Sequence, residues 1–81
     1  MPKIFIRDGF KFFFYSNEGN PRELLHVHIK KGEKNAKFWI EPEICLAENY
    51  GYSSKEINWI EEQVVEEIKL IEDTWNEFFG E

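Results

Sequence analysis

Residues 53–80 read SSKEINWIEEQVVEEIKLIEDTWNEFFG and carry the strongest secondary-structure signal in the chain. Ser53 and Glu56 have the spacing of a capping box, in which two side chains satisfy free backbone N–H groups at the start of a helix. Gly80 provides a stop signal. Apolar residues recur between them at intervals of three and four, and form one stripe: Ile57, Ile60, Val64, Ile68, Ile71, Trp75 and Phe78. The pattern predicts an amphipathic C-terminal helix.

This helix is longer than a domain of 81 residues needs. A straight helix over residues 54–79 would extend about 39 Å, at about 1.5 Å per residue. Two alternatives follow. Either the helix breaks near residues 66–69 into a helical hairpin, or its end projects and packs on a partner.

The first half of the chain has the composition of β-strands. Runs of β-branched and aromatic residues cover 4–6, 10–15, 26–30 and 36–40, and residues 44–47 form a candidate short edge strand. We therefore predict an α+β fold, in which an antiparallel sheet of four or five strands is covered on one face by a long C-terminal helix or helical hairpin. We expect a single domain over residues 1–81, with the sheet in 1–47 and helical structure in 53–79.

The Asp8-Gly9 pair indicates a hairpin between the first two strands but permits two registers. A two-residue turn would place Arg7 on the same face as Phe10. A three-residue loop, with Gly9 left-handed, would pair Ile6 with Phe10 and keep that face purely apolar. Because register follows the hydrophobic pattern, we predict the three-residue loop.

Strand alternation in this register sorts the side chains onto two faces. One face is apolar and forms the predicted core: Ile4, Ile6, Phe10, Phe12, Phe14, Val27, Ile29, Ala36, Phe38 and Ile40. The other face mixes cations, imidazoles and large aromatic rings: Lys3, Phe5, Arg7, Lys11, Phe13, Tyr15, His26, His28, Lys30, Lys37 and Trp39.

This second face is the candidate binding surface, because no predicted element obviously covers it. Aromatic and basic residues suit a small protein partner or a second copy of the chain. They also suit single-stranded RNA, whose bases stack on rings while its phosphates meet cations. A third alternative is that residues 45–52 fold back over the face. The predicted binding residues are Lys11, Phe13, Tyr15, Lys30, Lys37 and Trp39.

His26 and His28 form the one constellation that resembles a chemical site. On a strand their side chains project to the same side, about 6.6 Å apart along the chain. Such a pair could supply a general acid and base for RNA cleavage, or two of the roughly four ligands that zinc needs. Because no third ligand stands at a useful spacing, we predict no metal and no cofactor. If the protein is an enzyme, His26 and His28 are its candidate catalytic residues; otherwise they are exposed or face a partner.

Charge and cysteine content limit the location and the partners. The net charge of −6 divides into +4 for residues 1–40 and −10 for residues 41–81, which indicates two different outer surfaces. A protein that is acidic overall is a poor general binder of nucleic acid. The single cysteine, Cys45, implies no oxidising compartment, and we expect it to be a small buried apolar residue. Without a signal peptide or a membrane-spanning run, we expect a cytoplasmic protein that does not bind membranes.

Several segments together resemble a bacterial family known as domain of unknown function 4160. The most recognisable is His26-Val27-His28, which follows an Asn20-Pro21 turn. The other matching segments are residues 1–2, 4–5, 8–10, 12–18, 20–23, 36–39, 46–49 and 75–77. Leu24-Leu25 depart from the family pattern, which usually has prolines there.

The resemblance implies no established activity. It does imply a gene context, because genes of this family often lie beside a second small uncharacterised gene, as in toxin–antitoxin modules. On this basis we expect a partner-binding component of a two-gene module. The alternative is a small RNA-binding protein or ribonuclease that uses the His-x-His strand.

Overall fold

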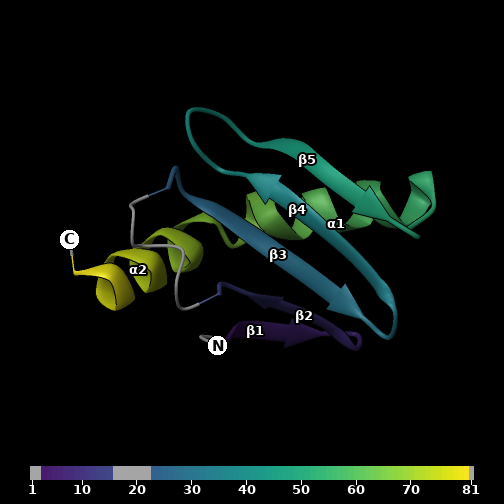
Figure 1. Ribbon diagram of the computed structural model, residues 1–81, viewed down its shortest axis with the longest axis horizontal. Coiled ribbons are helices and arrows are strands. Elements are labelled where there is room, and N and C mark those ends of the chain that lie inside the picture. The colour runs from purple at the N-terminus through teal and green to yellow at the C-terminus, as the bar shows by residue number, and fades with distance from the viewer. Residues whose placement is uncertain (1–2, 16–22, 81) are drawn as a thin grey trace.

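The computed structural model describes residues 3–15 and 23–80 (Figure 1). Five strands form one antiparallel sheet in which each strand pairs with the next along the chain, and two helices follow. The elements are β1 (Lys3–Arg7), β2 (Phe10–Phe13), β3 (His26–Lys31), β4 (Lys34–Trp39), β5 (Cys45–Tyr50), α1 (Ser54–Glu66) and α2 (Ile68–Phe79). The predicted α+β fold is confirmed.

The hydrophobic core lies between one face of the sheet and the two helices, and we call this the covered face. Its largest contributions are aromatic, which lets a short chain bury much apolar area with few side chains. The sheet supplies Phe10, Phe12, Phe14, Val27, Ile29, Ala36, Phe38 and Ile40, and the helices supply Ile60, Val64, Ile71 and Trp75. These residues match the predicted core with two exceptions: Ile4 is only partly buried against it, and Ile6 is exposed.

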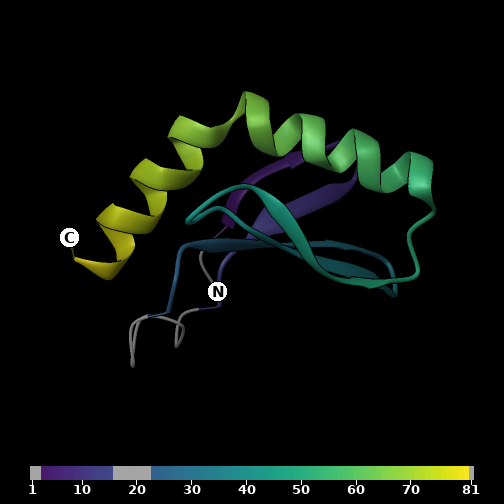
Figure 2. The ribbon, with the colours of Figure 1, turned by 90° about the horizontal axis from the view of Figure 1, so that it is seen from above.

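The C-terminal helix begins where the sequence predicts, and of the two alternatives for its length the structure has the break, without the helical hairpin. Ser53 accepts a hydrogen bond from the backbone N–H of Glu56, and the Glu56 carboxylate accepts one from the backbone N–H of Ser53. The break is at Glu67, and α2 then turns toward one end of the sheet instead of folding back along α1 (Figure 2). At the end of α2, Phe79 packs against the core, whereas Phe78 is 48% exposed. The predicted apolar stripe, which ended on Phe78, is therefore wrong at its last residue.

The first hairpin differs from its predicted register. Arg7 pairs with Phe10 across a two-residue turn, in which Asp8 and Gly9 have φ angles of 52° and 82°. Two positive φ values in succession are those of a type I′ turn, which suits the twist of the flanking strands. A bulge after Lys3 then changes the register again. As a result Ile6 is 50% exposed instead of buried.

The fifth strand is longer than predicted. It covers Cys45–Tyr50 and pairs with β4 at the edge of the sheet, so residues 45–50 do not fold over a face. Cys45 is exposed, which corrects the prediction that it is buried. Among the described residues, neither helix is long and apolar enough to cross a membrane.

Candidate functional site

The side of the sheet that faces away from α1 carries three rows of side chains, because directly opposite residues in antiparallel strands share a face. Figure 2 shows α1 along the other side of the sheet. The first row is Ile6, Lys11, Lys30, Asn35 and Tyr50; the second is Lys3, Phe13, His28, Lys37 and Glu48; the third is His26, Trp39 and Cys45. We call these residues, with Tyr15, the open face.

An aromatic cluster lies at the end of β2. The ring of His28 is stacked on Phe13, with centroids 5.6 Å apart and planes 25° apart, and it meets Tyr15 edge-on at 4.6 Å. Phe13 and Tyr15 are in T-shaped contact at 5.2 Å. Phe13 is only 3% exposed, whereas Tyr15 is 42% exposed. Phe13 therefore supports the cluster, and Tyr15 presents an aromatic surface to solvent.

A second aromatic position lies on β4. The Lys37 ammonium nitrogen is 4.3 Å from the centroid of the Trp39 ring, within the range of a cation–π interaction. Glu48 is directly opposite Lys37 on β5. The structure thus brings together Phe13, Tyr15, His28, Lys37 and Trp39, as the sequence predicts.

His26 belongs to the third row but is fully buried, which corrects its expected exposure. Two tryptophans pack on its imidazole: Trp75 of α2, with centroids 5.4 Å apart, and Trp39 of β4, at 5.5 Å. His26 Nδ1 lies 2.7 Å from the Leu24 carbonyl oxygen. Since a carbonyl only accepts, Nδ1 carries the proton in this geometry. The His26 and His28 rings are 5.1 Å apart, but only His28 is partly exposed.

Arg7 and Phe5 lie on the covered side and not on the predicted binding face. Arg7 donates hydrogen bonds to Gln63 Oε1 at 2.7 Å and to Glu67 Oε2 at 2.8 Å. The hydrogen bond to the Glu67 carboxylate raises the pKa of the guanidinium. Arg7 therefore ties β1 to the break between α1 and α2, which is a structural role.

Sequence reasoning missed five members of the open face: Ile6, Asn35, Cys45, Glu48 and Tyr50. Ile6 would have been found from the two-residue Asp8-Gly9 turn. Tyr50 and Glu48 lie on the part of β5 that was not predicted as strand, and they reach this face through pairing with β4.

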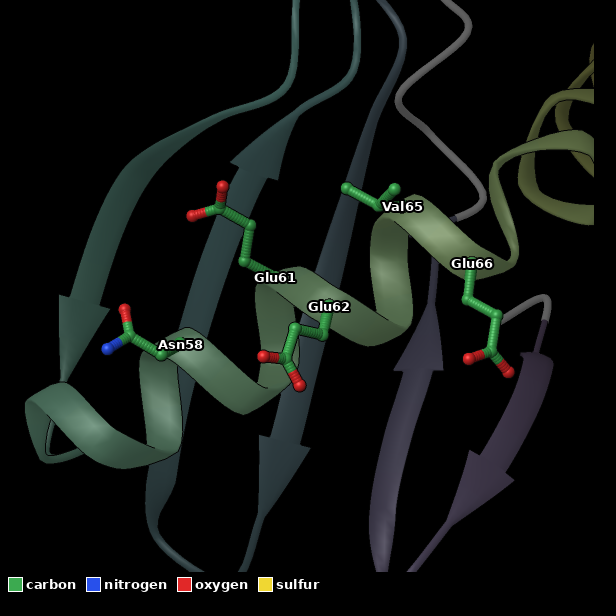
Figure 3. A pocket seen from close by; sticks show the side chains of 5 residues that line it. All are labelled: Asn58, Glu61, Glu62, Val65 and Glu66. Carbon is green, nitrogen blue, oxygen red and sulfur yellow. The ribbon is translucent and has the colours of Figure 1, made fainter.

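The two sides of the molecule differ in charge. The open face carries four lysines and one glutamate. The outer side of α1 carries a hollow with three carboxylates, lined by Asn58, Glu61, Glu62, Val65 and Glu66 (Figure 3). In the described ranges, no three His, Cys, Asp or Glu residues come together as a metal site. The arrangement is that of a basic surface with aromatic side chains on an otherwise acidic protein.

Comparison with known proteins gives one family. Searches of curated proteins and of solved structures found no match. The sequence pattern of domain of unknown function DUF4160 matches residues 9–76, from the first turn to the last part of α2. The match covers most of the chain, and the protein belongs to the DUF4160 family.

Proposed function

We propose that this protein is the partner-binding component of a toxin–antitoxin-like two-gene module, and that it binds a small protein through the open face. The observation that carries this proposal is that Tyr15, Tyr50 and several lysines are exposed on the face of the sheet that α1 does not cover, apart from the end where Trp75 packs on His26. Figures 1 and 2 show α1 on the other side of the sheet. Folding alone gives no reason to place Tyr15 and Tyr50, which are 42% and 62% exposed, on one surface with four lysines.

The composition of the face supports a protein partner. Protein interfaces are enriched in tyrosine and tryptophan, and a few such residues supply most of the binding energy. Tyr15 and Trp39 are the candidate anchors, because each has a ring that is held by neighbouring residues and still partly exposed. Lysines around such anchors steer an acidic partner to the surface.

Native mass spectrometry of the protein purified from its own host tests this function. We expect a complex with the product of the adjacent small gene. In the same assay with the two proteins co-expressed, Tyr15→Ala and Trp39→Ala should each weaken the complex at least tenfold. Val65→Ala, which removes a 53% exposed apolar side chain from α1, is the matched control and should leave it within twofold. A bare monomer, or equal effects of the three variants, would contradict the proposal.

RNA binding or cleavage through the same face is the second candidate function. It draws support from His28, which is partly exposed and contacts both Phe13 and Tyr15, where a base could stack beside a proton-transferring group. In that function His28 would contact RNA. His26, buried behind it, would act by positioning His28, and Lys11, Lys30 and Lys37 would meet phosphates.

Single-stranded RNA and the variant His28→Ala distinguish this candidate from protein binding. A ribonuclease should lose cleavage in His28→Ala while the circular dichroism spectrum stays native. A protein-binding component should show no cleavage at all, and its complex should be more sensitive to Trp39→Ala than to His28→Ala.

A further inference from the structure

We propose that Lys11 and Lys30 form an anion-binding pair that takes a carboxylate from an acidic, extended segment of the protein partner. This inference rests on the proposed function and names the chemistry of the partner.

The first observation is the position of the two lysines. They are directly opposite each other on β2 and β3, and both are exposed. Directly opposite residues have Cβ atoms about 5 Å apart, and like charges at this distance destabilise a sheet. Within residues 3–15 and 23–80, no carboxylate forms an ion pair with either lysine, whereas Lys34 pairs with Glu56 and Lys69 with Asp73. Folding gains nothing from this pair, but a bound anion would stabilise it.

The second observation is the row in which the pair lies. Ile6 lies beside Lys11 at one end, and Asn35 and Tyr50 continue the row beyond Lys30. Ile6 and Tyr50 are 50% and 62% exposed, so both ends of the row offer apolar surface. At about 4.8 Å between strands, five strands span about 19 Å, the length of roughly six extended residues. The row therefore fits a short segment with central acidic residues and apolar residues at both ends.

The third observation is the charge of the remaining molecule, which favours a protein segment over RNA. The chain has a net charge of −6, and its acidic residues are concentrated on the helices behind the sheet. The field of a protein that is acidic overall opposes the approach of a polyanion, most strongly at low salt. It repels every phosphate of a nucleic acid, whereas one or two carboxylates between lysines are attracted at short range. Ile6 also offers no ring on which a base could stack.

A nuclear magnetic resonance titration of the full chain tests the pair. The probe is a capped hexapeptide with two central glutamates between leucines. We expect shifts at the backbone amides of residues 6, 11, 30 and 50, and at least a tenfold loss of affinity in the double variant Lys11→Glu/Lys30→Glu. The double variant Lys55→Glu/Lys69→Glu makes the same change in net charge on the helices and should retain affinity within twofold. Circular dichroism verifies that both variants are folded.

Three outcomes would overturn the inference. One is an equal loss of peptide affinity in Lys11→Glu/Lys30→Glu and in Lys55→Glu/Lys69→Glu. A second is tighter binding of hexauridylate than of the peptide at Lys11 and Lys30, which would assign the pair to nucleic acid. The third is a complex with the adjacent gene's product that keeps its full affinity in Lys11→Glu/Lys30→Glu; this would refute the lysine pair while leaving the proposed function intact. Absence of any such complex would instead refute the proposed function.

Discussion

On the covered face of the sheet, Phe12, Val27 and Phe38 are fully buried beneath the helices, whereas on the open face Lys11, Lys30 and Tyr50 extend into solvent. Both faces belong to the same five strands and alternate along them residue by residue. Burial of apolar area, at about 25 cal/mol per Å², explains every residue of the first set. It explains none of the second.

This difference separates residues kept for folding from residues available for function. An exposed lysine or tyrosine contributes little to the free energy of unfolding. Two lysines directly opposite each other on neighbouring strands lower it. The exposed residues of the open face therefore have a composition that stability does not require, whereas Phe13 and His26 on the same face are buried. The predictions below test whether the two faces separate in this way, from the largest expected effect to the smallest.

The largest effect is expected in the core. Phe12 is fully buried and stacked on Phe5, with ring centroids 4.3 Å apart. Phe12→Ala should lower the free energy of unfolding by about 3–5 kcal/mol, through lost burial and the cavity left behind. Because small domains have only about 5–15 kcal/mol in total, urea denaturation should show a large loss of stability. A loss below about 1 kcal/mol would mean that the covered face is not the core.

The packing of α1 on the covered face depends on the capping box at the N-terminus of this helix. Ser53→Ala removes the hydroxyl that accepts a hydrogen bond from the backbone N–H of Glu56, and should cost about 1 kcal/mol in urea denaturation. Ser54→Ala, one residue later at the first helical position, is the matched control and should cost less. Equal costs would show that the capping box does not stabilise α1.

Tyr52 gives the covered face a pH dependence. Burial raises its pKa to about 12, and its hydroxyl donates to the Ile29 and Lys34 carbonyl oxygens at 3.3 and 3.1 Å. The raised pKa favours the neutral form in the folded state, so its contribution is complete below about pH 10 and is lost as the pH rises toward 12. Stability should therefore fall across this interval.

Tyr52→Phe should remove that part of the pH dependence, at a cost of about 1 kcal/mol at neutral pH for the lost hydrogen bonds. The measurement is urea denaturation at pH values from 7 to 12. Tyr50→Phe on the open face keeps Tyr52 and should retain the fall. An unchanged slope in Tyr52→Phe would contradict this account of Tyr52.

The smallest effect on stability is expected on the open face. Tyr50→Ser removes a 62% exposed ring and should change the free energy of unfolding by less than about 0.5 kcal/mol. The same variant should weaken binding of the glutamate–leucine peptide, because Tyr50 ends the row that contains Lys11 and Lys30. A large loss of stability without a loss of peptide binding would show that Tyr50 serves folding and not binding.

The parts of the fold that could be predicted from the sequence are those set by local chemistry. The capping box at Ser53 and Glu56 follows from residues within one turn of each other. The break at Glu67 was one of two alternatives, and it came from the length of the helix and not from a local signal. The apolar pattern of the inner strands was sufficient to identify Phe12, Val27 and Phe38 as core residues.

The errors arise where distant residues decide the outcome. The hydrophobic pattern favoured burial of Ile6, but the hairpin instead directs Arg7 to the covered side, where Gln63 and Glu67 accept its hydrogen bonds. The pattern also gave no sign that Trp75 would cover His26. The end of β5 is polar and forms a strand because β4 pairs with it.

The most direct test of the open face as the binding surface is lysine acetylation, read out by mass spectrometry, of the protein alone and in complex with the adjacent gene's product. Lys11, Lys30 and Lys37 report on the open face, and Lys55 and Lys69 report on the helices within the same sample. We predict that the complex slows acetylation of the first three lysines and leaves the other two unchanged. Slowing at Lys55 and Lys69, with Lys11, Lys30 and Lys37 unaffected, would contradict the account.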